Sequence, residues 1–198
     1  MNLIYNEFVD IFEEKFVAPT YQEWRVEGKS GKDTVGKNFE LFNRFLYELY
    51  DIPLLDNKNK ILGTKYNPDI AIGKDNDNVI IVEEDKGHYL DLCFLDRGAM
   101  NAAKVFRKCV EENKSAPFFV ISCVTSYSLY DEVIKEDVNL FNDHISILMQ
   151  EHLLYFPLCA HDRVNENYFT ENKSPFKLDQ KLVEERLNFF YRIKNGMK

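Results

Sequence analysis

The sequence predicts an α/β fold in which helices flank a central mixed β-sheet. Segments with apolar residues at helical spacing alternate with short runs that are apolar throughout, and two of these runs are joined by a tight polar turn. Runs that are apolar on both faces are typical of strands in the middle of a covered sheet. A strand, a helix and a further strand in succession usually form a parallel pair with a right-handed crossover. We therefore expect one central sheet between helices.

The first part of the chain is expected to be helical. Residues Leu3–Phe16 have the pattern of an amphipathic helix, and a second helix is predicted over Val35–Tyr50. Between them, Arg25–Lys37 carries glycine and lysine residues, so we expect an exposed loop there. The apolar stripe of the second helix consists of Phe39, Phe42, Phe45, Leu46 and Leu49.

The middle of the chain is expected to form the sheet. Asp69–Ile72 and Val79–Val82 are predicted strands, and the turn Gly73–Asn78 between them makes an antiparallel hairpin. A helix predicted over Asp96–Asn113 leads to a buried strand at Phe118–Cys123. By the crossover rule, that strand should lie parallel to its neighbour in the sheet.

Two further elements complete the prediction, a strand at Ile145–Met149 and a C-terminal amphipathic helix over Leu178–Lys194. No repeat, low-complexity tract or obvious linker divides the chain. We therefore expect a single domain over residues 1–198, with a core at about 35–149 and a helical extension at about 178–196.

The composition excludes several classes of protein. The 198 residues are 45% hydrophobic, which is too apolar for a disordered tail, and the four cysteines form no CxxC pair that would favour structural zinc. No signal peptide or apolar run of about 20 residues is apparent, so we expect a cytoplasmic protein without a membrane span. The net charge of -8 argues against a nonspecific nucleic-acid coat protein, but not against a site for a metal cation.

One cluster of charged residues is placed where chemistry could occur. Asp69 follows Pro68 at the start of the first predicted strand, and Glu84, Asp85 and Lys86 end the second. Because side chains alternate along a strand, Glu84 and Lys86 should share one face and address whatever Asp69 faces. Carboxylates on adjacent strands can hold Mg²⁺ through oxygen ligands, with water completing its coordination. A neighbouring lysine, here Lys86, can orient or deprotonate the attacking water and offset negative charge on a phosphate.

These residues resemble the PD-(D/E)xK nuclease superfamily. The motif consists here of Pro68-Asp69, fourteen intervening residues, and then Glu84-x-Lys86. The predicted order of a helix, a strand meander, a helix and a strand is similar to the core of that superfamily, over roughly residues 35–149. The resemblance is to type II restriction endonucleases in particular, and it implies a restriction-endonuclease-like core.

The resemblance also implies roles for individual residues. Asp69, Glu84 and Lys86 would be catalytic, and a magnesium ion, with manganese as a substitute, would be bound by Asp69, Glu84 and the backbone carbonyl of Asp85. A further acid is expected on the first core helix, where Glu40 is the candidate and a solvated helix face is the alternative.

One residue departs from the family pattern. The position between the acid and the lysine is usually small or apolar in that superfamily, whereas here it is Asp85. Its side chain should point away from Glu84 and be either solvated or paired with a lysine or arginine. A register shifted by one residue would instead turn Glu83 and Asp85 toward the site, but no lysine then has the right spacing, so we favour the first register.

Candidate contacts to DNA lie outside this motif. Between Lys173 and Lys198 there are seven basic and three acidic residues, a local charge of +4 against the acidic total. This segment and the loop at residues 25–37 are candidates for contact with the DNA backbone, with ordinary solvated surfaces as the alternative. The residues singled out as nucleic-acid contacts are Lys29, Lys32, Lys37, Ser126 and Tyr127.

The sequence therefore predicts a magnesium-dependent endonuclease that cuts DNA at a specific site. Its expected partners are double-stranded DNA, a second copy of the chain in a homodimer, and a cognate DNA methyltransferase as functional companion. Two alternatives stay open: a repair, recombination or RNA-cleaving nuclease of the same superfamily, and an inactive module that binds nucleic acid.

Overall fold

The computed structural model describes residues 3–56, 61–87, 103–126, 152–161 and 169–196. Its helical elements are α1 (Tyr5–Phe12), η1 (Glu13–Val17), α2 (Ala18–Tyr21), η2 (Gln22–Val26), α3 (Gly31–Leu49), η3 (Ile61–Gly63), a helix at residues 103–111, and α8 (Gln180–Gly196). Its strands are β1 (Ile70–Asp75), β2 (Asn78–Gly87), β3 (Phe118–Ser126), β4 (Leu153–His161) and β5 (Phe176–Leu178).

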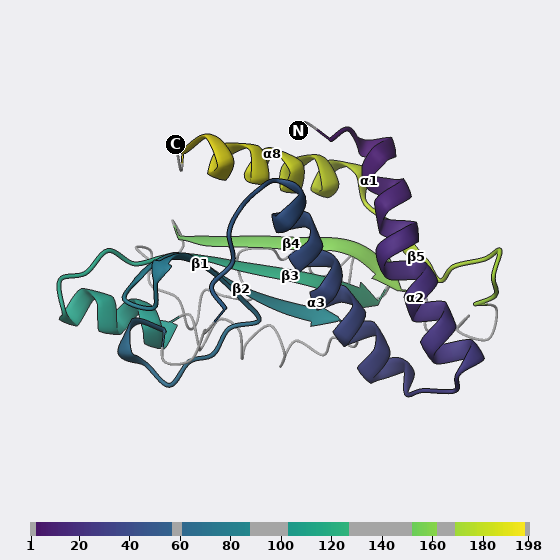
Figure 1. Ribbon diagram of the computed structural model, residues 1–198, viewed down its shortest axis with the longest axis horizontal. Coiled ribbons are helices and arrows are strands. Elements are labelled where there is room, and N and C mark those ends of the chain that lie inside the picture. The colour runs from purple at the N-terminus through teal and green to yellow at the C-terminus, as the bar shows by residue number, and fades with distance from the viewer. Residues whose placement is uncertain (1–2, 57–60, 88–102, 127–151, 162–168, 197–198) are drawn as a thin grey trace.

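The strands form one mixed sheet in the order β1-β2-β3-β4-β5, which confirms the predicted α/β architecture. The outer pairs β1–β2 and β4–β5 are antiparallel, whereas β2–β3 and β3–β4 are parallel. The parallel pairing of β2 with β3 agrees with a crossover through the helix at residues 103–111. Figure 1 shows α1, α3 and α8 over one face of the sheet and the helix at residues 103–111 away from them. Among the residues that the structure describes, no helix has the length and apolar character needed to cross a membrane.

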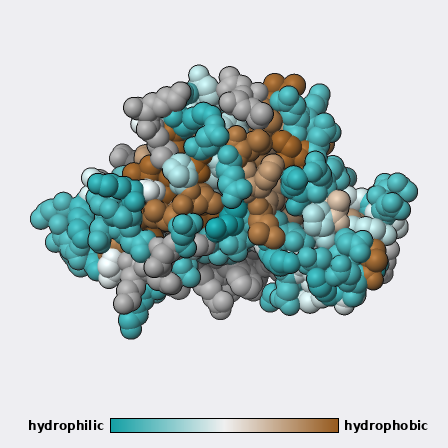
Figure 2. All heavy atoms as spheres, viewed as in Figure 1, coloured by the Kyte–Doolittle hydropathy of each residue, from teal (hydrophilic) through white to brown (hydrophobic). Residues whose placement is uncertain are grey.

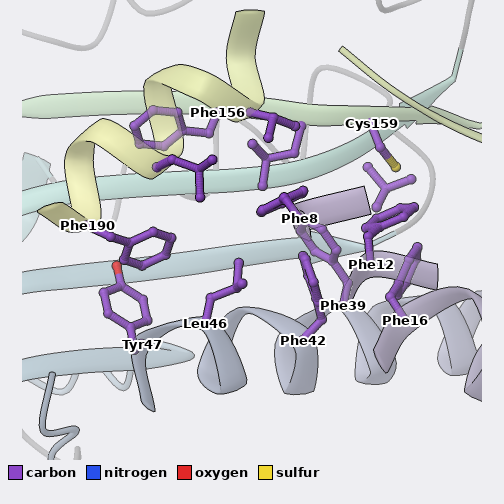
Figure 3. Packing of buried hydrophobic residues seen from close by; sticks show 14 of the residues in the cluster. Phe8, Phe12, Phe16, Phe39, Phe42, Leu46, Tyr47, Phe156, Cys159 and Phe190 are labelled. Atoms are coloured by element: carbon purple, nitrogen blue, oxygen red, sulfur yellow. The ribbon is translucent and has the colours of Figure 1, made fainter. Parts of the chain in front are cut away.

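Two apolar cores lie on the two faces of the sheet. The larger one packs phenylalanines of α1 and η1 against those of α3, with Phe8 and Phe12 meeting Phe42 edge-on at 5.6 Å and 5.4 Å between ring centroids (Figure 3). Each such pair contributes about 0.5–1.5 kcal/mol beyond the burial of its area. The smaller core joins β2 and β3 to the helix at residues 103–111 through Val82, Val105 and other residues. On the face seen in Figure 2, hydrophobic residues gather near the centre and hydrophilic ones dominate both ends.

The N-terminal helical segment is longer than predicted. Helical backbone continues from Tyr5 to Val26 through two wide π-helical turns, so the expected end at Phe16 is wrong. Pro19 lies within this segment and has no N–H to donate to the Lys15 carbonyl. Just before the proline, the Ala18 N–H donates to the Glu13 carbonyl five residues back, rather than to the carbonyl four residues back as in an α-helix. The wider turn therefore accommodates the proline without ending the helix.

The loop predicted up to Lys37 is also shorter than expected, because α3 begins at Gly31 rather than at Val35. The Ser30 hydroxyl accepts a hydrogen bond from the Asp33 N–H at 3.5 Å and so caps the helix. Phe39, Phe42 and Leu46 of the predicted stripe are fully buried. Leu55 lies in the segment that connects α3 to β1, and its N–H donates to the Ala71 carbonyl at 2.9 Å. The connecting segment therefore contacts the outer edge of β1.

The hairpin of β1 and β2 is antiparallel, as predicted, but its strands extend further into the turn. Only Asn76 and Asp77 lie between the strands, and the Asp75 carboxylate accepts bonds from the Asp77 and Asn78 N–H groups at 3.0 Å and 2.9 Å. The ladder is irregular at Gly73, where a side chain would lie 2.3 Å from the Asn78 carbonyl oxygen. The glycine therefore permits the close approach that the bulge requires.

The sequence did not predict the fourth and fifth strands. Pro157 lies inside β4, where the register with β3 shifts between Ser122 and Val124. Proline cannot donate to a ladder and is tolerated at such a bulge, but it weakens the strand signal in the sequence. The strand predicted at Ile145–Met149 lies outside the described residues, as do residues 96–102 of the predicted helix Asp96–Asn113.

Candidate active site at the end of the hairpin

The three residues predicted to carry the chemistry meet at one end of the β1–β2 hairpin. Asp69 immediately precedes β1, and its Oδ2 accepts a hydrogen bond from the Asp85 backbone N–H of β2 at 2.7 Å. The Lys86 ammonium group lies 3.4 Å from the same Oδ2 and also contacts the Glu84 carboxylate. The carboxylates of Asp69 and Glu84 therefore converge on a single cation, the arrangement expected from strand alternation.

Lys86 is held as a cation by this arrangement. Burial lowers the pKa of Lys86, but the neighbouring Glu84 and Asp69 carboxylates outweigh burial and leave the pKa above its ordinary value. The lysine side chain is only 19% exposed, so water screens these contacts incompletely. In this metal-free state Lys86 is a cation that can donate hydrogen bonds and attract negative charge.

Two further residues support the acids, and sequence reasoning missed both. Tyr66 hydrogen-bonds to the Glu84 carboxylate, and burial together with the negative charge of Glu84 raises the Tyr66 pKa well above its ordinary value. From α3, Arg44 donates to the Asp69 backbone carbonyl at 3.2 Å. In the sequence, Tyr66 stands two positions before Pro68 and Arg44 lies on the predicted helix. Neither position is specific enough to predict a contact with the acids.

Asp85 does not have the surroundings expected for it. Its side chain does lie on the opposite face of β2 from Glu84, but it is buried and accepts a 2.7 Å hydrogen bond from the Asn43 amide rather than from a lysine or arginine. Within the described residues, its Oδ2 has no hydrogen-bond donor. Burial, with the negative charges of Glu83 and Asp69, raises the Asp85 pKa well above its ordinary value.

Glu83, on the same face as Asp85, is fully buried and fully hydrogen-bonded. It accepts bonds from the Tyr47 hydroxyl, from the Ser122 hydroxyl at 2.5 Å, and from Arg186 at 2.6 Å and 2.8 Å. Arg186 is one of the seven basic residues in the segment Lys173–Lys198 that is predicted to contact the DNA backbone, and for this residue the prediction is wrong, because its side chain is 0% exposed. The buried ion pair joins residues 103 positions apart, and no local pattern indicates it.

A cavity of about 310 Å³ opens beside the converging acids. Glu40, the candidate acid on the first core helix, lines it and lies 3.7 Å from Arg44. Gly36 and Gly87 come so close that a side chain on Gly87 would lie 2.6 Å from the Gly36 Cα. This contact brings the N-terminal half of α3 next to the site. The residues lining the cavity are Lys32, Asp33, Gly36, Glu40, Asp85, Lys86 and Gly87.

The predicted nucleic-acid contacts are only partly brought near this cavity. Lys32 lines it, whereas Lys29 and Lys37 line a neighbouring cavity, where both form ion pairs with Glu23, at 3.7 Å and 2.9 Å. Ser126 ends β3, but its side chain, like all of Tyr127, lies outside the described part of the structure.

The donor set fits a hard divalent cation. Two carboxylates already face one positive charge, and carboxylate, carbonyl and water oxygens are the ligands that Mg²⁺ prefers. No group of three or more histidine, cysteine, aspartate or glutamate side chains in the described ranges is arranged around a common metal position. Asp69 and Glu84 would therefore supply two ligands, and the Asp85 carbonyl and water the others.

Neither family models, nor curated proteins, nor solved structures gave a match to this chain.

Proposed function

We propose that this protein is a magnesium-dependent endonuclease of the PD-(D/E)xK superfamily that hydrolyses DNA phosphodiester bonds, most similar to a type II restriction endonuclease. The observation that carries the proposal is the convergence of the Asp69 and Glu84 carboxylates on Lys86 at the open end of an antiparallel hairpin. The order of α3, the β1–β2 hairpin, a crossover helix and a parallel β3 supports a restriction-endonuclease-like core.

The residues at this end of the hairpin suit phosphodiester hydrolysis. Asp69, Glu84 and the Asp85 carbonyl would hold Mg²⁺, which when bound polarises a phosphate and lowers the pKa of a water ligand. Lys86 donates hydrogen bonds to the attacking water and offsets the negative charge that grows on the phosphate. Tyr66 fixes the Glu84 carboxylate from the side, and Arg44 holds the backbone at Asp69.

The cavity beside α3 is the path that we propose for the DNA backbone. Two lysines, Lys32 and Lys86, line the cavity beside the acids Asp33, Glu40 and Asp85, and these lysines are the groups that would contact a phosphate entering it. A palindromic recognition site would require two such sites related by a two-fold axis, and hence a homodimer. A DNA methyltransferase that protects the same sequence would be the functional companion.

Cleavage by the purified protein tests this proposal. With Mg²⁺ and phage or plasmid DNA, the wild-type chain should give discrete fragments, and Asp69→Asn and Lys86→Met should give none while keeping the wild-type circular dichroism spectrum. Lys74→Met, on the exposed part of β1, is the matched control and should cut normally. Preferential cutting of branched DNA or RNA would reassign the substrate within the superfamily. Metal-independent DNA binding without any cleavage would support an inactive binding module, and retained cleavage in Lys86→Met would refute the mechanism.

A further inference from the structure

The buried carboxylate of Glu83 connects four elements behind the candidate site. It lies on β2 and accepts hydrogen bonds from Tyr47 of α3, Ser122 of β3 and Arg186 of α8. Both Glu83 and Arg186 have side chains that are 0% exposed. A single carboxylate thus fixes β2 relative to two helices and a neighbouring strand.

The guanidinium group of Arg186 is itself held by aromatic rings. It lies 4.5 Å from the ring centroid of Phe190 and 5.1–5.3 Å from those of Tyr47, Phe156 and Phe189. Its Nε and Nη1 have no hydrogen-bond partner within the described residues, so the rings and Glu83 together set its orientation. The ion pair is therefore enclosed by packing on several sides as well as buried.

Stability alone is a weak reason for such a pair. Taking two charges out of water is costly, and buried ion pairs are often replaced by apolar residues without loss of stability. The position of this pair in the sheet suggests a different role. Glu83 is paired with Ile70 of β1 on one side and with Val120 of β3 on the other. It is the last residue of β2 with ladder partners on both sides.

Beyond Glu83, the part of β2 that carries the candidate site is paired with a neighbouring strand on one side only. Glu84 to Gly87 continue the ladder with β3, but on the β1 side the Asp85 N–H bonds to the Asp69 side chain instead of a strand. Small rotations about this segment would move Glu84 and Lys86 relative to Asp69. Anchoring the strand at Glu83 limits those rotations.

On the basis of the proposed function, we propose that Arg186 is a positioning residue of the nuclease site, acting through Glu83 to fix the end of β2 that carries Glu84 and Lys86. The C-terminal helix α8 thereby contributes to the reaction without approaching the substrate. Misplacement of reacting groups by about 1 Å can cost up to about 100-fold in rate, so a loosened β2 end should be visible in kcat.

A charge-free double variant separates positioning from folding. In Glu83→Gln with Arg186→Met, the glutamine can still accept from Tyr47 and meet Ser122, and methionine fills the space among the rings. This variant should keep a cooperative unfolding transition close to that of the wild type. Its kcat for DNA cleavage should fall about 10- to 100-fold with little change in KM. Lys74→Met, at an exposed position of β1 outside the candidate DNA-contacting segments, is the control and should leave kcat unchanged.

Amide hydrogen exchange measured by NMR supplies a readout that does not depend on cleavage. Exchange at the Asp85 amide, which bonds to Asp69, should accelerate in the double variant, while exchange in α1 should not change. A stably folded double variant with wild-type kcat and unchanged Asp85 exchange would overturn the inference. If the wild type cleaves no nucleic acid, the proposed function fails, and the Asp85 exchange rate still shows whether Arg186 fixes the end of β2.

Discussion

Glu83 and Glu84 are consecutive in the chain, yet their carboxylates lie on opposite faces of β2 and have different partners. The Glu83 carboxylate is fully buried beneath α3 and α8 and is neutralised by Arg186. The Glu84 carboxylate contacts Lys86 on the other face, with 12% of its side chain exposed. Strand geometry thus places a structural acid and a candidate catalytic acid side by side.

Removing the Tyr47 hydroxyl should destabilise the fold. In Tyr47→Phe, the buried Glu83 carboxylate loses one donor and cannot recover it from water. We expect a loss of about 1–3 kcal/mol in the free energy of unfolding, measured by urea titration. Tyr191→Phe, on the exposed side of α8, should change it little. Equal stability of both variants would show that Tyr47 contributes only its ring.

The contact between Gly36 and Gly87 should not tolerate a methyl group. In Gly87→Ala, the added Cβ would lie 2.6 Å from the Gly36 Cα and 2.8 Å from the Val35 carbonyl oxygen, so α3 must move away from β2. We expect a destabilisation of about 1–3 kcal/mol in thermal or urea unfolding. Gly196→Ala has open space around it and is the control. If Gly87→Ala unfolds like the wild type, the two backbones are not in close contact.

The candidate site was predictable from local rules, whereas the network behind it was not. A polar turn between two apolar runs indicates a hairpin, and alternation then places Glu84 and Lys86 together opposite Asp69. The partner of Glu83 is 103 residues away on a helix where Lys181 and Arg192 are exposed, so no local pattern distinguishes Arg186 from a surface charge. Pro157 weakened the strand prediction for the residues of β4, because proline usually argues against an inner strand.

Loss of the Lys86 charge should make the protein depend on divalent cations. In Lys86→Met, the Asp69 and Glu84 carboxylates repel one another without a cation between them. With EDTA present, we expect a destabilisation of about 1–2 kcal/mol, since these side chains are partly screened by water. Added Mn²⁺ should restore stability to a greater extent than it stabilises the wild type. Lys74→Met should show neither effect, and an equal response of Lys86→Met and wild type to Mn²⁺ would contradict the shared site.

The buried acid Asp85 should make the stability of the metal-free protein fall as pH rises. Burial and the charges of Glu83 and Asp69 raise its pKa above the ordinary value of 3.8, so the folded state binds more protons than the unfolded state above that pH. By linkage, its contribution to stability is present below pH 3.8 and is lost as pH rises toward the folded-state pKa.

The variant Asp85→Asn removes this titration and retains an oxygen that can accept from Asn43. Urea unfolding in EDTA between pH 4.5 and 8 should show the variant gaining stability over the wild type as pH increases, because only the wild type must bury a charge there. Asp77→Asn, in the exposed turn of the hairpin, is the control and should follow the wild-type curve. Parallel curves for Asp85→Asn and wild type would mean that Asp85 ionises as readily in the fold as in the unfolded chain.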